Sequence, residues 1–211
     1  LEHGVVLPRV LVPGEIGSPG SSLGRGLPQV ASQVERDSPA VILLLSDGTG
    51  RPELLVCAVP FLRDRDIRQA SAAETLEEKG RLLREGIRDH YQQICDQAEQ
   101  MRQSIDPDLP LVALGHLFVA GGQTREGDGV RELSIGGLDR IEGSSFPDGI
   151  DYLALGHLHI GQLVAGNPYR RYSGAPLAMS FAEAGQDKQV LLLRCEGRHF
   201  AIDPLPVPTF Q

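Results

Sequence analysis

The first half of the chain contains two apolar runs that are separated by a short polar stretch. The runs at 41–45 (VILLL) and 54–59 (LLVCAV) have the length and composition of buried strands. The stretch between them contains Asp47-Gly48-Thr49-Gly50, which is typical of a tight turn. This pattern predicts a β-hairpin.

Apolar side chains then recur at helical spacing over residues 71–104. Ser71 followed by Glu74 is a capping-box signal for the start of a helix, and Pro107 favours its end. We therefore predict one long amphipathic helix over 71–104. Two glycines inside it are expected to weaken it by about 1 kcal/mol each relative to alanine, namely Gly80 and Gly86.

Strand signals dominate the rest of the chain. The candidates are 111–115, 130–135, 151–156, 169–173, 188–194 and 199–203. Many strands beside one long helix predict a mixed α/β fold. A segment rich in Gly, Pro and Ser, at about 13–38, is expected to form a mobile loop.

The pentapeptide ALGHL occurs twice, at 113–117 and 154–158, and each copy closes an apolar run. Each copy predicts a buried strand that ends in Gly-His, and the second continues into a further histidine. The imidazoles of His116, His157 and His159 are therefore expected just beyond strand carboxyl ends, where open α/β sheets bind their ligands. Because imidazole is the commonest side-chain metal ligand, the pattern predicts a metal site.

A single histidine after a buried strand is more often a hydrogen-bonded core or turn residue than a metal ligand. Two Gly-His strand ends together with a His-x-His favour the metal interpretation, because residues two apart in a strand point to the same side. The other histidines lack this context. His90 is expected to be solvated on the helix, His3 is terminal, and His199 lies in a polar turn, so we assign them no site.

Composition narrows the class of protein. At 211 residues with 41% apolar content, the chain can form one large domain or part of one. Its three widely spaced cysteines favour free thiols in a reducing compartment, and we expect a cytoplasmic location. No apolar stretch could cross a bilayer and no signal peptide begins the chain, so no membrane partner is expected. The formal charge of −8 counts mildly against a simple DNA-binding module.

Further signals come from longer segments of the chain, including those that contain the histidines. Gly115-His116 and residues 156–159 (GHLH) match the last two motifs of the calcineurin-like metallophosphoesterases. Residues 57–67 (CAVPFLRDRDI) are similar to the C-x-I-P-F-L-R-P-R-D-I segment of the SbcD family, the nuclease subunits of SbcCD complexes. Residues 130–139 (VRELSIGGLD) resemble the V-R-x-x-x-I-G-x-L-D of the same family.

A further segment of the same family is R-Y-x-G-S-P-x-x-L-S-F-x-E followed by a lysine. Residues 171–181 (RYSGAPLAMSF), followed by Lys188, resemble it. Within this segment Ser173 and Gly174 match the family without being ligands there, and a turn that packs under the site explains them more simply.

The resemblance implies a four-layer α-β-β-α sandwich that hydrolyses DNA phosphodiester bonds as an exonuclease and endonuclease. It also implies two divalent metal ions, with manganese preferred in the complete protein. Carried over by position, His116 and His157 would bind one ion and His159 the other. The implied partners are DNA, an SbcC-type coiled-coil ATPase and a second copy in a homodimer.

The chain also departs from the family. It lacks a D-x-H and a G-N-H-D, and its one G-D, Gly127-Asp128, follows His116 and is therefore in the wrong order. We interpret residues 1–211 as the C-terminal two thirds of a nuclease domain, without its capping and SbcC-binding parts. In the family, the G-D motif supplies a carboxylate that bridges the two metal ions. Since this carboxylate is missing, we expect no manganese-dependent nuclease activity from this chain alone.

Two alternatives stay open at this point. The chain could be a catalytically degenerate scaffold or partner-binding domain of the same fold, or a phosphodiesterase for small molecules. Arg63 and Arg65 could contact phosphate, although the neighbouring Asp64 and Asp66 make a locally paired surface the simpler explanation.

Overall fold

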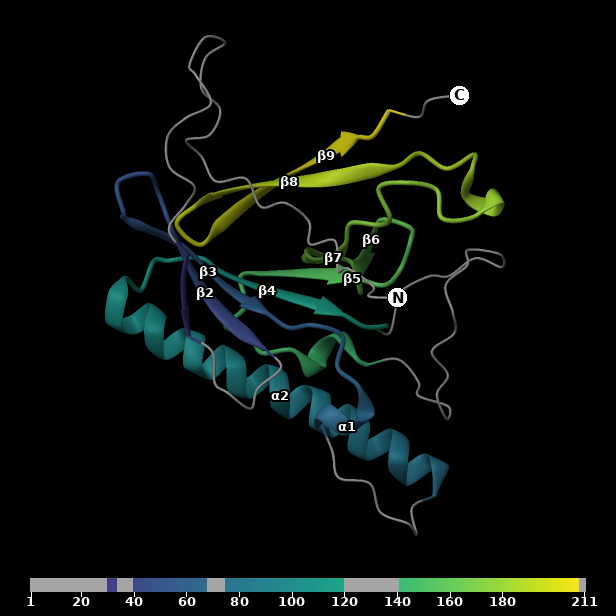
Figure 1. Cartoon of the computed structure of the whole chain (residues 1–211), viewed down its shortest axis with the longest axis horizontal. Helices are drawn as coiled ribbons and strands as arrows, with labels where there is room; N and C mark the ends of the chain where they lie inside the picture. Colours follow the sequence, from purple (N-terminus) through teal and green to yellow (C-terminus); the bar gives the residue numbers. More distant parts are fainter. Residues whose placement is uncertain (1–29, 34–39, 68–74, 120–140, 209–211) are drawn as a thin grey trace.

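A computed structural model describes residues 30–33, 40–67, 75–119 and 141–208. These residues form a seven-stranded sheet in the order β1-β2-β3-β4-β5-β7-β6, a separate β8-β9 hairpin and one long helix (Figure 1). The strands of the main sheet are β1 (Val30–Gln33), β2 (Val41–Ser46), β3 (Pro52–Ala58), β4 (Leu111–His116), β5 (Tyr152–Gly156), β6 (Gln162–Val164) and β7 (Asn167–Tyr172). The remaining elements are α1 (Asp64–Ile67), α2 (Leu76–Ile105), the 3₁₀ turns η1 (Gly143–Ser145) and η2 (Phe181–Glu183), β8 (Gln189–Glu196) and β9 (His199–Pro206).

The main sheet is mixed. Strands β1, β2 and β3 are antiparallel neighbours, whereas β3, β4, β5 and β7 all run parallel and β6 returns antiparallel to β7. The predicted hairpin is confirmed, and the Asp47 carboxylate closes its turn by accepting hydrogen bonds from the backbone N–H groups of Thr49 (2.8 Å) and Arg51 (2.9 Å). The mixed α/β content confirms the predicted fold class.

Helix α2 covers one face of the main sheet (Figure 1). Its buried stripe keeps helical spacing, as the sequence predicted, and consists of Leu83, Ile87, Tyr91, Ile94, Cys95 and Ala98. The helix begins after Thr75, whose hydroxyl accepts a hydrogen bond from the Glu78 N–H (3.2 Å). The predicted Ser71 cap lies outside the described residues. A Cβ at Gly86 would lie 2.8 Å from the Ile67 carbonyl oxygen, so this glycine permits the close approach of α1.

The β8-β9 hairpin lies over the other face of the main sheet (Figure 1). Leu193 and Phe200 of the hairpin pack on Leu54, Val56 and other buried side chains of β3, β4 and β5. The described residues therefore stack as helix, sheet and second sheet, which are three of the four layers that the resemblance implied.

Some elements differ from the sequence predictions. Val30–Gln33 forms the edge strand β1, paired with β2, although it falls within the segment predicted as a loop. The rest of that segment, 13–29 and 34–38, and the strand predicted at 130–135 lie outside the described residues. Strand β6 was not predicted, because three residues are too few for an alternating pattern. No helix among the described residues is long and apolar enough to span a bilayer.

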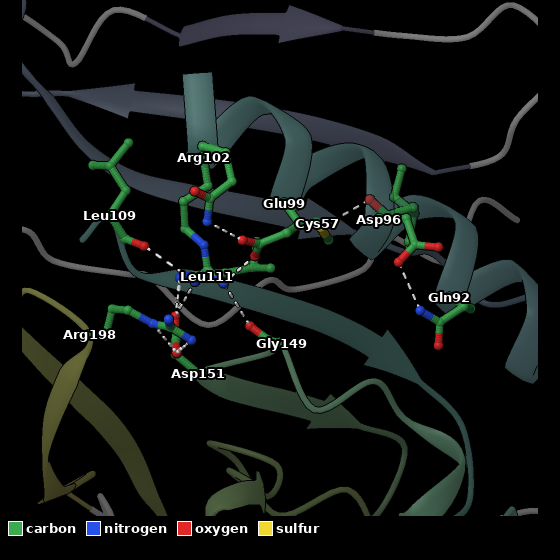
Figure 2. A network of polar contacts seen from close by, with 12 residues as sticks. Cys57, Gln92, Asp96, Glu99, Arg102, Leu109, Leu111, Gly149, Asp151 and Arg198 are labelled. Carbon is green, nitrogen blue, oxygen red and sulfur yellow. Dashed lines mark hydrogen bonds and ion pairs between the residues drawn. The ribbon is translucent and has the colours of Figure 1, made fainter. Parts of the chain in front are cut away.

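A buried charge network joins the layers at the amino ends of β4 and β5 (Figure 2). The Arg102 guanidinium, 2% exposed, donates to the Asp151 carboxylate (2.9 Å) and to that of Glu99. Asp151 also accepts from the Leu111 N–H (2.8 Å) and pairs with Arg198 (2.9 Å) in the β8-β9 turn. One carboxylate thus ties helix, sheet and hairpin together.

Candidate metal centre

The parallel strands β4 and β5 bring two of the predicted ligands together. His116 is the last residue of β4 and pairs in register with Gly156, the last residue of β5. His157 follows directly, and the centroids of the His116 and His157 rings lie 5.4 Å apart in an edge-to-face arrangement. The duplicated Gly-His strand ends therefore lie side by side, and that they bind metal stays a prediction.

Close backbone approach explains the glycine before each histidine. A Cβ at Gly115 would lie 2.1 Å from the Tyr91 hydroxyl oxygen, and one at Gly156 would lie 3.0 Å from the His116 Nδ1 atom. His157 has φ +111°, a conformation that costs a residue with a side chain on the order of 1–3 kcal/mol. The local backbone is therefore strained at the point where the imidazole enters the site.

The imidazoles of this site are held in the neutral form. Burial, followed by the proximity of His116 and His159, lowers the pKa of His157 to about 4. Burial, followed by the proximity of His159, also lowers the pKa of His116. Neutral imidazole is the form that binds metal, so at neutral pH both side chains are ready as ligands.

His159 is held by a carboxylate that sequence reasoning did not assign. Its Nδ1 atom lies 2.8 Å from the Glu183 Oε1 atom, and Glu183 is fully buried. The other carboxylate oxygen accepts from Lys188 Nζ (2.6 Å) and from the Met179 N–H (3.2 Å). The signal was present, since the glutamate and lysine of the SbcD-like segment align with Glu183 and Lys188.

The Ser173-Gly174 segment is a turn beneath His159, as predicted. Gly174 has φ +83°, and the following Ala175 N–H donates to the His159 carbonyl (3.0 Å). A Cβ at Gly174 would lie 2.7 Å from the Gly161 nitrogen. A cavity of about 300 Å³ opens beside this turn, with His159 and Lys188 in its wall.

Other candidate residues lie apart from the site or outside the described residues. His199 is exposed at the start of β9. The prediction of a solvated His90 is wrong. Its side chain is half-buried on α2, and burial lowers its pKa. Arg63 forms a two-pronged ion pair with Asp66 (2.7 and 3.1 Å), which confirms local pairing for this arginine. His3, Gly127-Asp128 and the side chain of Arg65 lie outside what the structure describes.

The donor set fits a metal centre in part. Neutral imidazoles and a carboxylate behind His159 are the groups that surround many protein-bound metals. Within the ranges that the structure describes, however, no three His, Cys, Asp or Glu side chains surround one common point. The arrangement is therefore a pair of imidazoles with a third imidazole beside it. A hard ion such as manganese needs additional oxygen ligands.

The comparisons with known proteins point to one family, although no family model matches the chain. The chain is 39% identical over 171 residues to the SbcD subunit of the nuclease SbcCD from Escherichia coli K12, and the match covers 81% of this chain and 41% of the relative. It is 33% identical over 174 residues to the SbcD subunit from Rhodobacter capsulatus, with the same shares covered. The SbcD subunit from Bacillus subtilis is 39% identical over 51% of this chain and 27% of the relative. The chain thus spans about two fifths of the length of the first two relatives.

Proposed function

We propose that this chain, as an SbcD-like polypeptide, supplies the histidine half of a two-metal phosphodiesterase centre. The proposed reaction is hydrolysis of DNA phosphodiester bonds during double-strand-break repair. The observation that carries the proposal is the 5.4 Å approach of the His116 and His157 rings at adjacent strand ends. Similarity to proteins named as nuclease subunits supports the choice of substrate.

Within this centre each side chain has a proposed role. As the family resemblance implies, His116 and His157 would hold one divalent ion and His159, whose Nδ1 atom contacts Glu183, would hold the second. When bound, such ions would supply charge that stabilises the attacking and the leaving oxygen of an in-line displacement. The chain's own part is to supply neutral nitrogen donors from rigid strand ends.

We also propose the assembly in which the centre works. The relatives are named as subunits of SbcCD, so an SbcC-type ATPase is the expected partner, together with a second copy of the SbcD-like protein. The preferred metal is proposed to be manganese in the complete protein. Cytoplasmic location remains our expectation from the free cysteines.

The first test is metal binding by this chain. In a protein with isotope-labelled histidines, added Mn²⁺ or Zn²⁺ should perturb the ring signals of His116, His157 and His159. His199 is the internal control, because it lies in the β8-β9 turn region near Asp151, at the opposite end of the sheet. Zinc should bind more tightly than manganese, since imidazoles without oxygen ligands favour zinc. Equal perturbation of all four signals would contradict the proposed site.

The second test is catalysis. We expect no manganese-dependent hydrolysis of bis(p-nitrophenyl) phosphate or linear DNA by the 211-residue chain, because the family's bridging carboxylate is absent from it. In the polypeptide encoded by the whole gene, His157→Ala should remove a nuclease activity that His199→Ala leaves intact. If that polypeptide binds SbcC-type protein but has no nuclease activity, the scaffold alternative is correct.

A further inference from the structure

Glu183 combines complete burial with a direct contact to the proposed metal centre. Its carboxylate is 0% exposed, whereas apolar side chains shortly before it face solvent. Leu177 and Met179 are each 66% exposed, and Phe181, two residues away, is fully exposed. The usual order is therefore inverted in this segment, because the charged residue is inside and the large apolar residues are outside.

Burying a carboxylate costs free energy unless it is paired and hydrogen-bonded, and the pairing of Glu183 is divided between its two oxygens. Oε2 accepts from Lys188 Nζ (2.6 Å) and from the Met179 N–H (3.2 Å). Oε1 faces the His159 ring at 2.8 Å, with the Ser180 hydroxyl at 3.4 Å. Lys188, 6% exposed, is thus bound on the oxygen that His159 does not use.

The charge state of Glu183 determines which nitrogen of His159 carries the proton. Burial opposes ionisation, but the Lys188 ammonium and the Met179 N–H both donate to Glu183 and stabilise its ionised form. An ionised carboxylate only accepts hydrogen bonds, so the Nδ1 atom that faces it must be the donor. In a neutral ring the Nε2 atom then carries a free lone pair.

We propose that Glu183 is a positioning residue of the metal centre, which holds His159 in the tautomer that offers Nε2 to a metal ion, with Lys188 fixing the carboxylate. This inference rests on the proposed function for its metal part only. It gives the SbcD-like glutamate and lysine a role that does not require either to touch the ion. If the Glu183–Lys188 ion pair served stability alone, substitution of Glu183 would not change the tautomer of His159.

The tautomer can be measured without metal, by long-range ¹⁵N–¹H correlation of the labelled His159 ring at pH 8. The unsubstituted chain should show protonated Nδ1 and unprotonated Nε2. In Glu183→Gln a single carbonyl oxygen remains, and Lys188 should take it, so the Nδ1–H tautomer should be lost. In the double variant Glu183→Gln/Lys188→Met the amide oxygen is free to turn to His159, and the Nδ1–H tautomer should return.

Glu196→Gln is the matched control, because Glu196 is an exposed carboxylate on β8. It should leave the tautomer unchanged, and thermal unfolding together with the His199 signal verifies that each variant is folded. Protonated Nε2 in the unsubstituted chain, or a tautomer that does not respond to Glu183→Gln, overturns the inference. So does failure of the double variant to restore it in a folded protein.

Zinc titration by calorimetry supplies the second readout. Loss of such an outer carboxylate typically weakens metal affinity 10–100-fold, and we expect Glu183→Gln to fall within this range while Glu196→Gln is unchanged. A tautomer change with unaltered zinc affinity overturns the positioning role. If the unsubstituted chain binds no zinc, the proposed function fails, and the tautomer measurement alone decides the assignment of Glu183.

Discussion

The two ends of strands β4 and β5 differ in how their polar groups are satisfied. At the amino ends, Asp151 is paired with Arg102 and Arg198 and accepts a backbone N–H (Figure 2). At the carboxyl ends, two imidazoles with lowered pKa values face each other across 5.4 Å, and His157 has a strained backbone. The same pair of strands therefore carries one end held by ion pairs and one end with neutral imidazoles and a strained backbone.

This difference indicates that the carboxyl ends of β4 and β5 suit a bound ligand better than the amino ends do. Charges at the amino ends neutralise one another within the protein, so nothing further is needed from a ligand. Neutral, closely spaced imidazoles at the carboxyl ends have donor capacity that the paired end lacks. Substitutions at the two ends of β4 and β5 should therefore differ in their effect on stability.

The largest effect is expected at the paired end. Asp151→Ala removes a buried partner of Arg102 and an acceptor for the Leu111 N–H, and should lower the free energy of unfolding by about 3–5 kcal/mol. Urea unfolding measures the change. Asp89→Ala, in the exposed pair with Arg88, is the control and should change it by less than about 1 kcal/mol. Equal effects would show that the network does not stabilise the fold.

The next largest loss of stability is expected from overpacking at the histidine end of β4. Gly115→Ala places a Cβ 2.1 Å from the Tyr91 hydroxyl oxygen and should cost about 1–3 kcal/mol of stability through overpacking. Gly48→Ala is the matched control, because its Cβ would meet no atom within 4 Å. Thermal and urea unfolding compare the two. A Gly115→Ala protein as stable as Gly48→Ala would contradict the close packing of α2 against β4.

The pH dependence of stability should come from the histidine end. The folded pKa of His157, about 4, lies below the ordinary value of 6.5, so the unfolded chain takes up the proton more readily. The contribution of neutral His157 is therefore complete above pH 6.5 and is lost as the pH falls toward 4. The urea midpoint should fall over this window, and His157→Asn should reduce the fall. His199→Asn should leave it unchanged, whereas identical pH profiles for both variants would contradict the assignment.

The smallest effect is expected at the exposed ion pair that follows β3. Asp66→Ala removes the partner of Arg63, whose side chain is 57% exposed, and should cost less than about 1 kcal/mol because solvent screens such pairs. Differential scanning calorimetry can resolve a change of this size. A loss as large as that of Asp151→Ala would mean that the segment after β3 depends on this pair.

Much of the fold could be predicted from local patterns. The β2-β3 hairpin and α2 have strong signals, since apolar alternation, turn residues and helical spacing act over a few residues. β1 was missed inside a loop-like composition, and β6 was missed because it has only three residues. Both are edge strands whose pairing depends on a neighbour rather than on their own pattern.

The candidate site divides in the same way. His116, His157 and His159 could be found from the repeated Gly-His strand ends, because each motif is contiguous in the chain. Glu183 could not be assigned a role from its position, since the contact with His159 joins residues 24 apart through a turn. The burial of His90 could likewise not be predicted from the sequence, because it depends on what packs against the helix.

The amino-acid sequence by itself determined the strand ends that carry the three imidazoles and the glycines that precede two of them, because these are properties of adjacent residues. Only the tertiary structure decided that β4 and β5 are parallel neighbours, that His116 and His157 meet, and that a buried carboxylate holds His159. Strand pairing and burial are set by packing between distant segments, and the chemistry of the imidazoles follows from that packing.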